Sequence, residues 1–170
     1  ILPPNAAAKV YSKNGSIIMG AVVGEGMLSV ISRDTDVQSF ADLAGKTVFV
    51  AGQGATPEYM ASYIAKKSGL EIGEAANQIN LSFSIPAAEI APSIIGKKIE
   101  YALVPEPFAT VATMKDPSIK RVINVQDAFA SVSGEKSYPM TVVVLRSEFA
   151  AKYPETVTQF LSAYKNAIAW

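Results

Sequence analysis

One unit recurs along this chain: an apolar, β-branched run, then a turn marked by glycine or proline, then the start of a helix. Its clearest instance is Lys46–Glu58, with the sequence KTVFVAGQGATPE. The apolar run predicts a buried strand of a parallel sheet. The glycines allow a sharp bend, and Thr56 followed by Pro57 predicts a capped helix start. Repeated units of this kind predict an α/β fold with a largely parallel sheet.

Hydrophobic periodicity predicts the other elements. We expect strands over residues 17–23, 27–32, 47–51, 79–83, 99–104, 121–125 and 140–145. We expect helices over residues 5–13, 56–68, 86–95, 108–114, 126–131 and 154–170, with a single capped turn at Ser39–Asp42. Pro92 predicts a kink or a later start of the third helix, because an interior proline removes a backbone hydrogen bond.

Two absences in the composition exclude several kinds of site. None of the 170 residues is cysteine or histidine, which excludes disulfides, thiol nucleophiles, histidine bases and thiolate or imidazole metal sites. Lysine and arginine together number 15, as do aspartate and glutamate, so there is no basic field for nucleic acid. Asp34-Thr35-Asp36 lacks the glycine and the distal glutamate of a calcium loop. We therefore expect no metal, no cofactor and no nucleic-acid partner.

The candidate ligand site follows from the turns between strands and helices. In open α/β sheets, ligands bind beyond the carboxyl ends of the strands. Helix N-termini there present N–H groups at the positive end of the helix dipole. The residues that fit this position are Pro4, Asn5, Gly52, Gln53, Gly54, Ala55, Thr56, Ser84 and Glu106. No catalytic residue is assigned, and the alternative is that the glycine turn merely makes a tight connection.

Several of these residues have two interpretations. Asn5 is either a helix N-cap or a ligand donor, and Thr56 fits a cap better than a ligand contact. Glu106 stands between two prolines, where it either accepts hydrogen bonds from a ligand amine or amide or binds the backbone amides of its own helix. Most aromatic residues at strand or helix spacing belong to the core, so only one of four is expected to stack on a flat ligand: Tyr59, Tyr101, Phe108 or Tyr138.

Four segments resemble a known family. Ser39–Val48 (SFADLAGKTV) resembles an entry motif of bacterial solute-binding proteins of ABC importers, and the turn GQGATPE follows at the place expected there. Residues 96–107 (GKKIEYALVPEP) and Phe149–Glu155 (FAAKYPE) resemble two further motifs. In this order, over essentially the whole chain, they are similar to the nitrate/sulfonate/taurine-type and thiamine-precursor-binding (NMT1-like) set.

The resemblance implies a periplasmic-binding-protein type II fold, with two α/β lobes around a ligand cleft. Lobe two would be residues 26–106, and an incomplete lobe one would be residues 1–25 and 107–170. The implied function is that of the extracytoplasmic component of an ABC importer. Such a protein captures a small ligand between its lobes, delivers it to a membrane permease and catalyses no reaction. The implied location is the periplasm, or the cell surface as a lipoprotein.

Departures from the family and rival functions complete the expectations. The lack of histidine, and alanine at position 55, argue against a strongly charged anion as ligand. The rivals are an effector-binding domain of a transcriptional regulator with the same fold, and a small enzyme that uses Glu106 as a base. We also expect 1–170 to be a segment lacking both termini. Its incomplete lobe would have an unpaired sheet edge or an exposed apolar face. The segment alone would therefore either self-associate or bind ligand far more weakly than the full-length chain.

Overall fold

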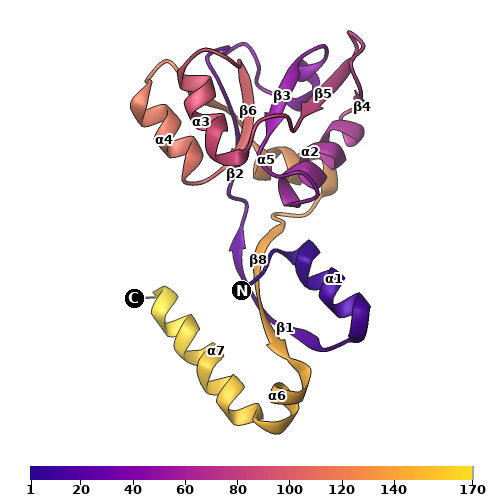
Figure 1. Ribbon diagram of the computed structural model, residues 1–170, viewed down its shortest axis with the longest axis vertical. Helices are drawn as coiled ribbons and strands as arrows, with labels where there is room; N and C mark the ends of the chain where they lie inside the picture. The colour runs from indigo at the N-terminus through magenta and orange to yellow at the C-terminus, as the bar shows by residue number, and fades with distance from the viewer. Residues whose placement is uncertain (170) are drawn as a thin grey trace. The chain divides into compact units, whose positions relative to one another are not determined.

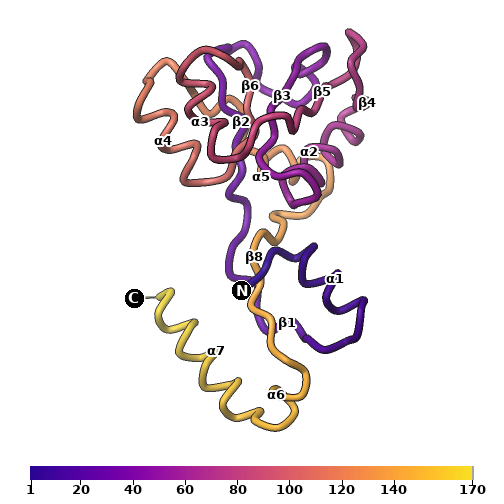
Figure 2. Tube along the Cα trace, in the orientation of Figure 1, coloured from indigo at the N-terminus to yellow at the C-terminus, as the bar shows by residue number. Residues whose placement is uncertain are grey.

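The computed structural model describes residues 1–169, which form two compact units. The larger unit comprises residues 26–138, and the smaller combines residues 1–25 with the described residues from Pro139 onward. The Cα trace in Figure 2 follows the chain through the elements of each unit. Trp170, which the sequence places in the last helix, lies outside the described residues.

A six-stranded sheet forms the centre of the larger unit (Figure 1). Its strands are β2 (Leu28–Ser32), β3 (Thr47–Val50), β4 (Glu71–Ile72), β5 (Gln78–Ser82), β6 (Tyr101–Pro105) and β7 (Lys120–Asn124). In space they follow the order β4-β5-β3-β6-β2-β7. The helices are α2 (Thr56–Lys67), α3 (Ala87–Ile95), α4 (Phe108–Lys115) and α5 (Val125–Ser133), with a 3-10 turn η1 (Phe40–Leu43). The short strand β4 was not predicted.

The sheet is largely parallel, as the sequence predicts, but it contains one reversed strand that the sequence did not reveal. β4, β5, β3 and β6 run parallel, whereas β2 is antiparallel to both of its neighbours, β6 and β7. Parallel neighbours need a crossover connection, which the helices after β3 and β5 help to supply. β2 follows directly on the preceding strand with no helix between them. The alternation of strands and helices therefore says nothing about the direction of β2.

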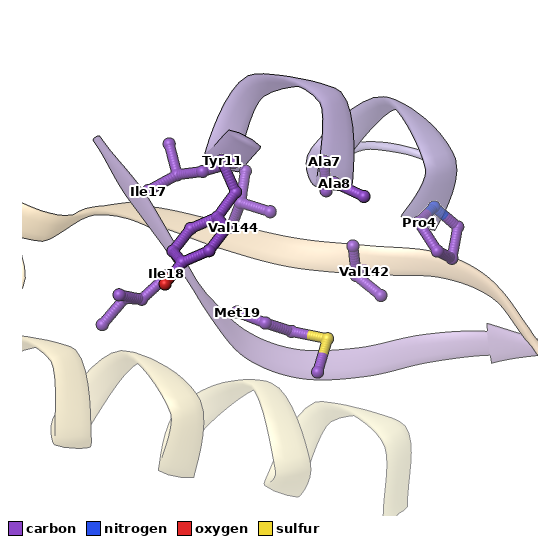
Figure 3. A pocket seen from close by; sticks show the side chains of 9 residues that line it. All are labelled: Pro4, Ala7, Ala8, Tyr11, Ile17, Ile18, Met19, Val142 and Val144. Carbon is purple, nitrogen blue, oxygen red and sulfur yellow. The ribbon is translucent and has the colours of Figure 1, made fainter. Parts of the chain in front are cut away.

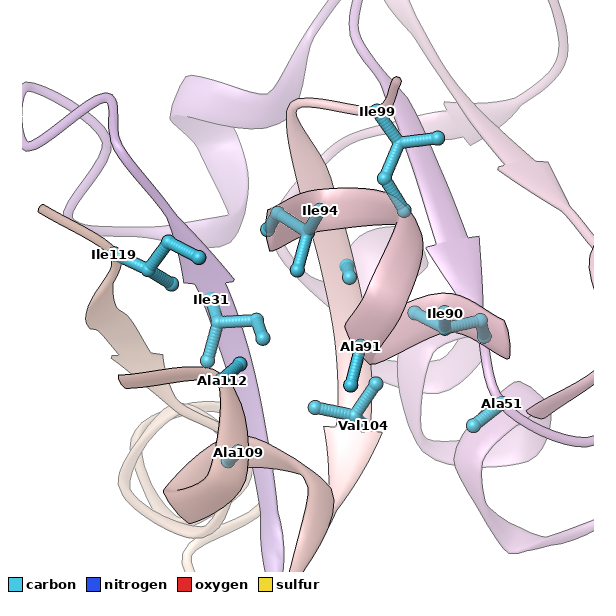
Figure 4. Packing of buried hydrophobic residues seen from close by; sticks show 11 residues of the cluster. Ile31, Ala51, Ile90, Ala91, Ile94, Ile99, Val104, Ala109, Ala112 and Ile119 are labelled. Carbon is cyan, nitrogen blue, oxygen red and sulfur yellow. The ribbon is translucent and has the colours of Figure 1, made fainter. Parts of the chain in front are cut away.

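Helices cover the sheet on both faces (Figure 1). α3 and α4 pack together against β6, and α2 packs beside α5. Figure 4 shows the core under α3 and α4, where Ile31 and Val104 meet Ile90 and Ile94. All four residues from 101 to 104 are buried, which explains why β6 has a continuous apolar sequence instead of an alternating one.

The smaller unit is built on a two-stranded antiparallel ribbon. Its elements are α1 (Pro4–Asn14), β1 (Ile17–Glu25), β8 (Pro139–Arg146), α6 (Ser147–Lys152) and α7 (Pro154–Ala169). Among its described hydrophobic residues only Val142 and Val143 are buried, whereas Met19 is 66% exposed. This unit therefore exposes apolar surface, and a ribbon of two strands is marginally stable on its own.

The two units differ from the lobe limits expected from the sequence. Both divisions have a boundary between residues 25 and 26. Residues 107–138 lie in the larger unit, however, because β7 pairs with β2 and α5 packs on the same sheet. The division of the full-length protein into lobes stays a prediction. Within residues 1–169, no helix combines the length and the apolar character needed to cross a membrane.

Candidate functional site

The carboxyl ends of four strands meet at one edge of the six-stranded sheet. β5, β3 and β6 are parallel, and β7 shares the direction of β6 because both are antiparallel to β2. The chain passes from these four strand ends into α3, α2, α4 and α5, respectively. Four helix N-termini, each with backbone N–H groups that lack a partner in the preceding turn, therefore lie along this edge. We call it the carboxyl edge.

The loop after β3 has the backbone that its glycines predict. Gly52 and Gly54 have φ values of 102° and 69°, a backbone conformation that residues other than glycine rarely adopt. The Gly54 N–H donates to Oε2 of Glu58 at 2.5 Å. A carboxylate of the first helical turn thus reaches back and binds the loop.

The prediction that Thr56 caps α2 is wrong. The N-cap position is occupied by Ala55, which is extended and offers no side-chain acceptor. Thr56 is the first helical residue and only 8% exposed. The helix begins at Thr56 because Pro57 suits its first turn, and the Glu58 side chain binds the preceding loop, not an N–H group of the helix.

Hydroxyl groups mark the loop after β5. The Oγ atoms of Ser82 and Ser84 lie 3.0 Å apart, and Ser84 is exposed. Helix α3 begins after Pro86, and no side chain caps its N-terminus. Pro92 lies within α3, which continues to Ile95. This loop therefore brings the exposed hydroxyl group of Ser84 to the carboxyl edge.

Glu106, after β6, is bound by the protein itself. Its Oε2 accepts the Thr110 N–H at 3.1 Å and the Thr110 hydroxyl at 2.7 Å. Its Oε1 accepts Nε and a terminal nitrogen of Arg121 at 3.3 and 2.9 Å. Burial alone would raise the pKa of Glu106, but the hydrogen bonds from Thr110 and Arg121 outweigh it and the pKa is lowered. The carboxylate is therefore ionised at neutral pH and already has four donors.

Asn124 caps the fourth helix at this edge. Its Oδ1 accepts the N–H groups of Gln126 and Asp127 at 2.9 and 3.4 Å. The start of α5 is thus occupied by an internal acceptor.

Pro4 and Asn5 belong to the smaller unit, in the first turn of α1. Pro4 lines a hollow of about 370 Å³ between α1 and the β1–β8 ribbon, and Figure 3 shows Tyr11, Ile18 and Met19 around the same hollow. The lining is apolar, which suits packing against other apolar surface better than recognition of a polar ligand. Pro4 and Asn5 are therefore part of α1 in the smaller unit. The other predicted site residues lie at the carboxyl edge of the larger unit: Gly52, Gln53, Gly54, Ala55, Thr56, Ser84 and Glu106.

Two of the aromatic candidates are occupied within the protein. Tyr101 is the first residue of β6, at the end of the strand opposite the carboxyl edge. Its hydroxyl donates a hydrogen bond to Asp34 and accepts one from Lys46 Nζ at 2.9 Å. Burial, followed by the hydrogen bond to Asp34, raises the pKa of Tyr101. Tyr138 is 3% exposed and packs edge-on against Phe129. Neither side chain is available to stack on a ligand at the carboxyl edge.

The sequence analysis missed four residues that shape this edge: Glu58, Thr110, Arg121 and Asn124. The spacing i, i+4 separates Gly54 from Glu58 and Glu106 from Thr110, so the first two could have been found. Asn124 directly precedes a helical segment, which is an N-cap signal. Arg121 lies 15 residues from Glu106, and only the pairing of strands brings the two together. Within residues 1–169, no three acidic, cysteine or histidine side chains gather in a way that could hold a metal ion.

Comparison with known proteins gives a family and a fold. The family model described as NMT1/THI5 like matches residues 18–170. A comparison with curated protein sequences found no match.

Three solved structures illustrate the fold. An ABC transporter protein from Parabacteroides distasonis superposes with a TM-score of 0.67 and 21% identity, over 92% of this chain and 51% of the other. The periplasmic aliphatic sulphonate binding protein SsuA of Escherichia coli superposes with a TM-score of 0.71 and 11% identity, over 93% of this chain and 50% of the other.

The third structure is the ligand-binding component of an ABC-type import system from Staphylococcus aureus, solved with zinc bound. It superposes with a TM-score of 0.64 and 15% identity, over 91% of this chain and 50% of the other. The fold is that of type II periplasmic binding proteins. The chain spans about half the length of these structures.

Proposed function

The chain belongs to the NMT1/THI5-like family, and on that premise we propose that it captures a small solute for an ABC importer. The full-length protein would bind the solute outside the cytoplasm and deliver it to a membrane permease. We place it in the periplasm or, as a lipoprotein, on the cell surface. The solved structures that share its fold include a periplasmic binding protein and a ligand-binding component of an importer.

One observation carries the proposal: three loops of the predicted site lie along the same edge of one sheet. Gly52–Thr56, Ser84 and Glu106 follow β3, β5 and β6, which are parallel neighbours. Backbone N–H groups at helix N-termini and serine hydroxyls can bind the polar groups of a small solute. The carboxyl edge is therefore our proposed ligand-binding surface, with the glycine loop and Ser84 as its contacts.

Solute capture fits this edge better than catalysis does. A base must be free to take a proton from a substrate, whereas Glu106 is held by Thr110 and Arg121. No observation favours the regulator, the other alternative considered from the sequence. We therefore propose a binding protein without enzymatic activity.

The experiment is native mass spectrometry of the full-length protein purified from its own host, followed by calorimetry with the solute that is released. Ser84→Ala should weaken binding, because it removes an exposed hydroxyl from the proposed surface. Ser131→Ala is the matched control, since Ser131 is exposed and its hydroxyl donates to the Ala128 carbonyl in its own helix. Absence of any retained or bound solute contradicts the function. Equal affinity of both variants and the wild type removes Ser84 from the site.

A further inference from the structure

The protein places its own carboxylates at the helix starts of the carboxyl edge. Glu58 accepts the N–H of Gly54 ahead of α2, and Glu106 accepts the N–H of Thr110 in α4. These backbone groups are the ones that would hold an anionic ligand in a site built from helix N-termini. Two of the four helix starts thus already have an anion, supplied by the chain.

The charged residues along this edge also disfavour an anionic ligand. The first turns of α2, α3 and α5 each contain an acidic residue: Glu58, Glu89 and Asp127. Arg121 lies near Glu106 at the start of α4, and its guanidinium is paired with the Glu106 carboxylate at 2.9 Å. The acidic residues offset the positive ends of the helix dipoles, so little attraction for an anion remains.

From these contacts we infer that the solute bound at the carboxyl edge carries no net negative charge. This inference rests on the proposed function and narrows it to uncharged or amine-bearing polar solutes. An anionic group that approached the glycine loop would face the Glu58 carboxylate and compete with it for the Gly54 N–H. The E. coli sulphonate-binding protein shares the fold, but the carboxyl edge of this chain is built to repel such a ligand.

Calorimetry on the full-length protein with two anionic probes, sulfate and ethanesulfonate, tests the inference. The wild type should bind neither with a dissociation constant below about 1 mM. Glu58→Gln keeps the shape of the side chain and removes its charge, so it should bind at least one probe about tenfold more tightly than the wild type. Glu135→Gln is the matched control, because Glu135 is exposed beyond the end of α5, and it should behave as the wild type.

The outcomes separate this inference from the function on which it rests. A wild-type dissociation constant below about 1 mM for either probe, or an anion as the solute found by mass spectrometry, overturns the inference and leaves the solute-binding function standing. Unchanged anion affinity in Glu58→Gln also overturns it, because the Glu58 charge would then not be what keeps anions from the glycine loop. A protein that binds no solute of any charge overturns the proposed function itself.

Discussion

Removing the side chain of Ile90 should destabilise the unit that carries the candidate site. Ile90 lies on α3, is fully buried, and belongs to the cluster that includes Ala51, the residue just before the glycine loop (Figure 4). Ile90→Ala removes three carbon atoms, and at about 0.8 kcal/mol per buried methylene the transfer loss is about 2.4 kcal/mol. The cavity left behind adds to this, so we expect a loss of about 3 kcal/mol in the free energy of unfolding. Ile90→Val should cost only about 1 kcal/mol.

Urea unfolding followed by circular dichroism measures the loss. With a slope of about 2 kcal/mol per molar urea, the midpoint of the 26–138 unit should fall by about 1.5 M in Ile90→Ala. Hydrogen exchange at the Ala51 amide, which donates to the Leu103 carbonyl at 3.0 Å, should accelerate at the same time. Ile72→Ala is the control, because Ile72 is 40% exposed on β4 and should cost less than about 1 kcal/mol. Equal effects of the two alanine substitutions would refute the packing argument.

Three further predictions concern a cap, a carboxylate and a surface. Asn124→Ala should destabilise the larger unit by about 0.5–2 kcal/mol in urea unfolding, and Asn124→Asp should restore most of this, because an acceptor returns to the start of α5. The hydrogen bonds from Ser118, followed by the one from Arg33, lower the pKa of Asp116 from 3.8 to about 2. Because the pKa is lowered in the folded state, the ionised Asp116 carboxylate stabilises the fold above pH 4, and this stabilisation is lost as the pH falls from 4 to 2. Asp116→Asn should therefore flatten that part of the pH–stability curve. Residues 1–170 alone should self-associate in analytical ultracentrifugation through the apolar surface around Met19, and Met19→Asp should shift them toward monomer. A wild-type monomer at about 100 µM would contradict the surface argument.

The sequence by itself determined where most elements lie and which turns connect them. The apolar run before Gly52 and the pair Thr56-Pro57 correctly placed β3 and the start of α2. The pattern works here because no residue of β3 is exposed and Val48 and Val50 are buried, and because a helix start needs residues that tolerate an unpaired N–H. The same local chemistry predicts that the glycine loop, Ser84 and Glu106 lie at strand ends.

Only the tertiary structure decided how those parts interact. The direction of β2, and therefore the neighbours of β7, depends on pairing between segments that are far apart in the chain. That pairing brings Arg121 to Glu106 and turns a candidate ligand residue into half of an internal ion pair. Spacing in a sequence reports contacts within one helix or one turn, whereas contacts between strands depend on the packing of the whole sheet. The sequence identified the glycine loop, Ser84 and Glu106 as residues at strand ends, but the fold added Arg121 and decided which residues remain free to bind.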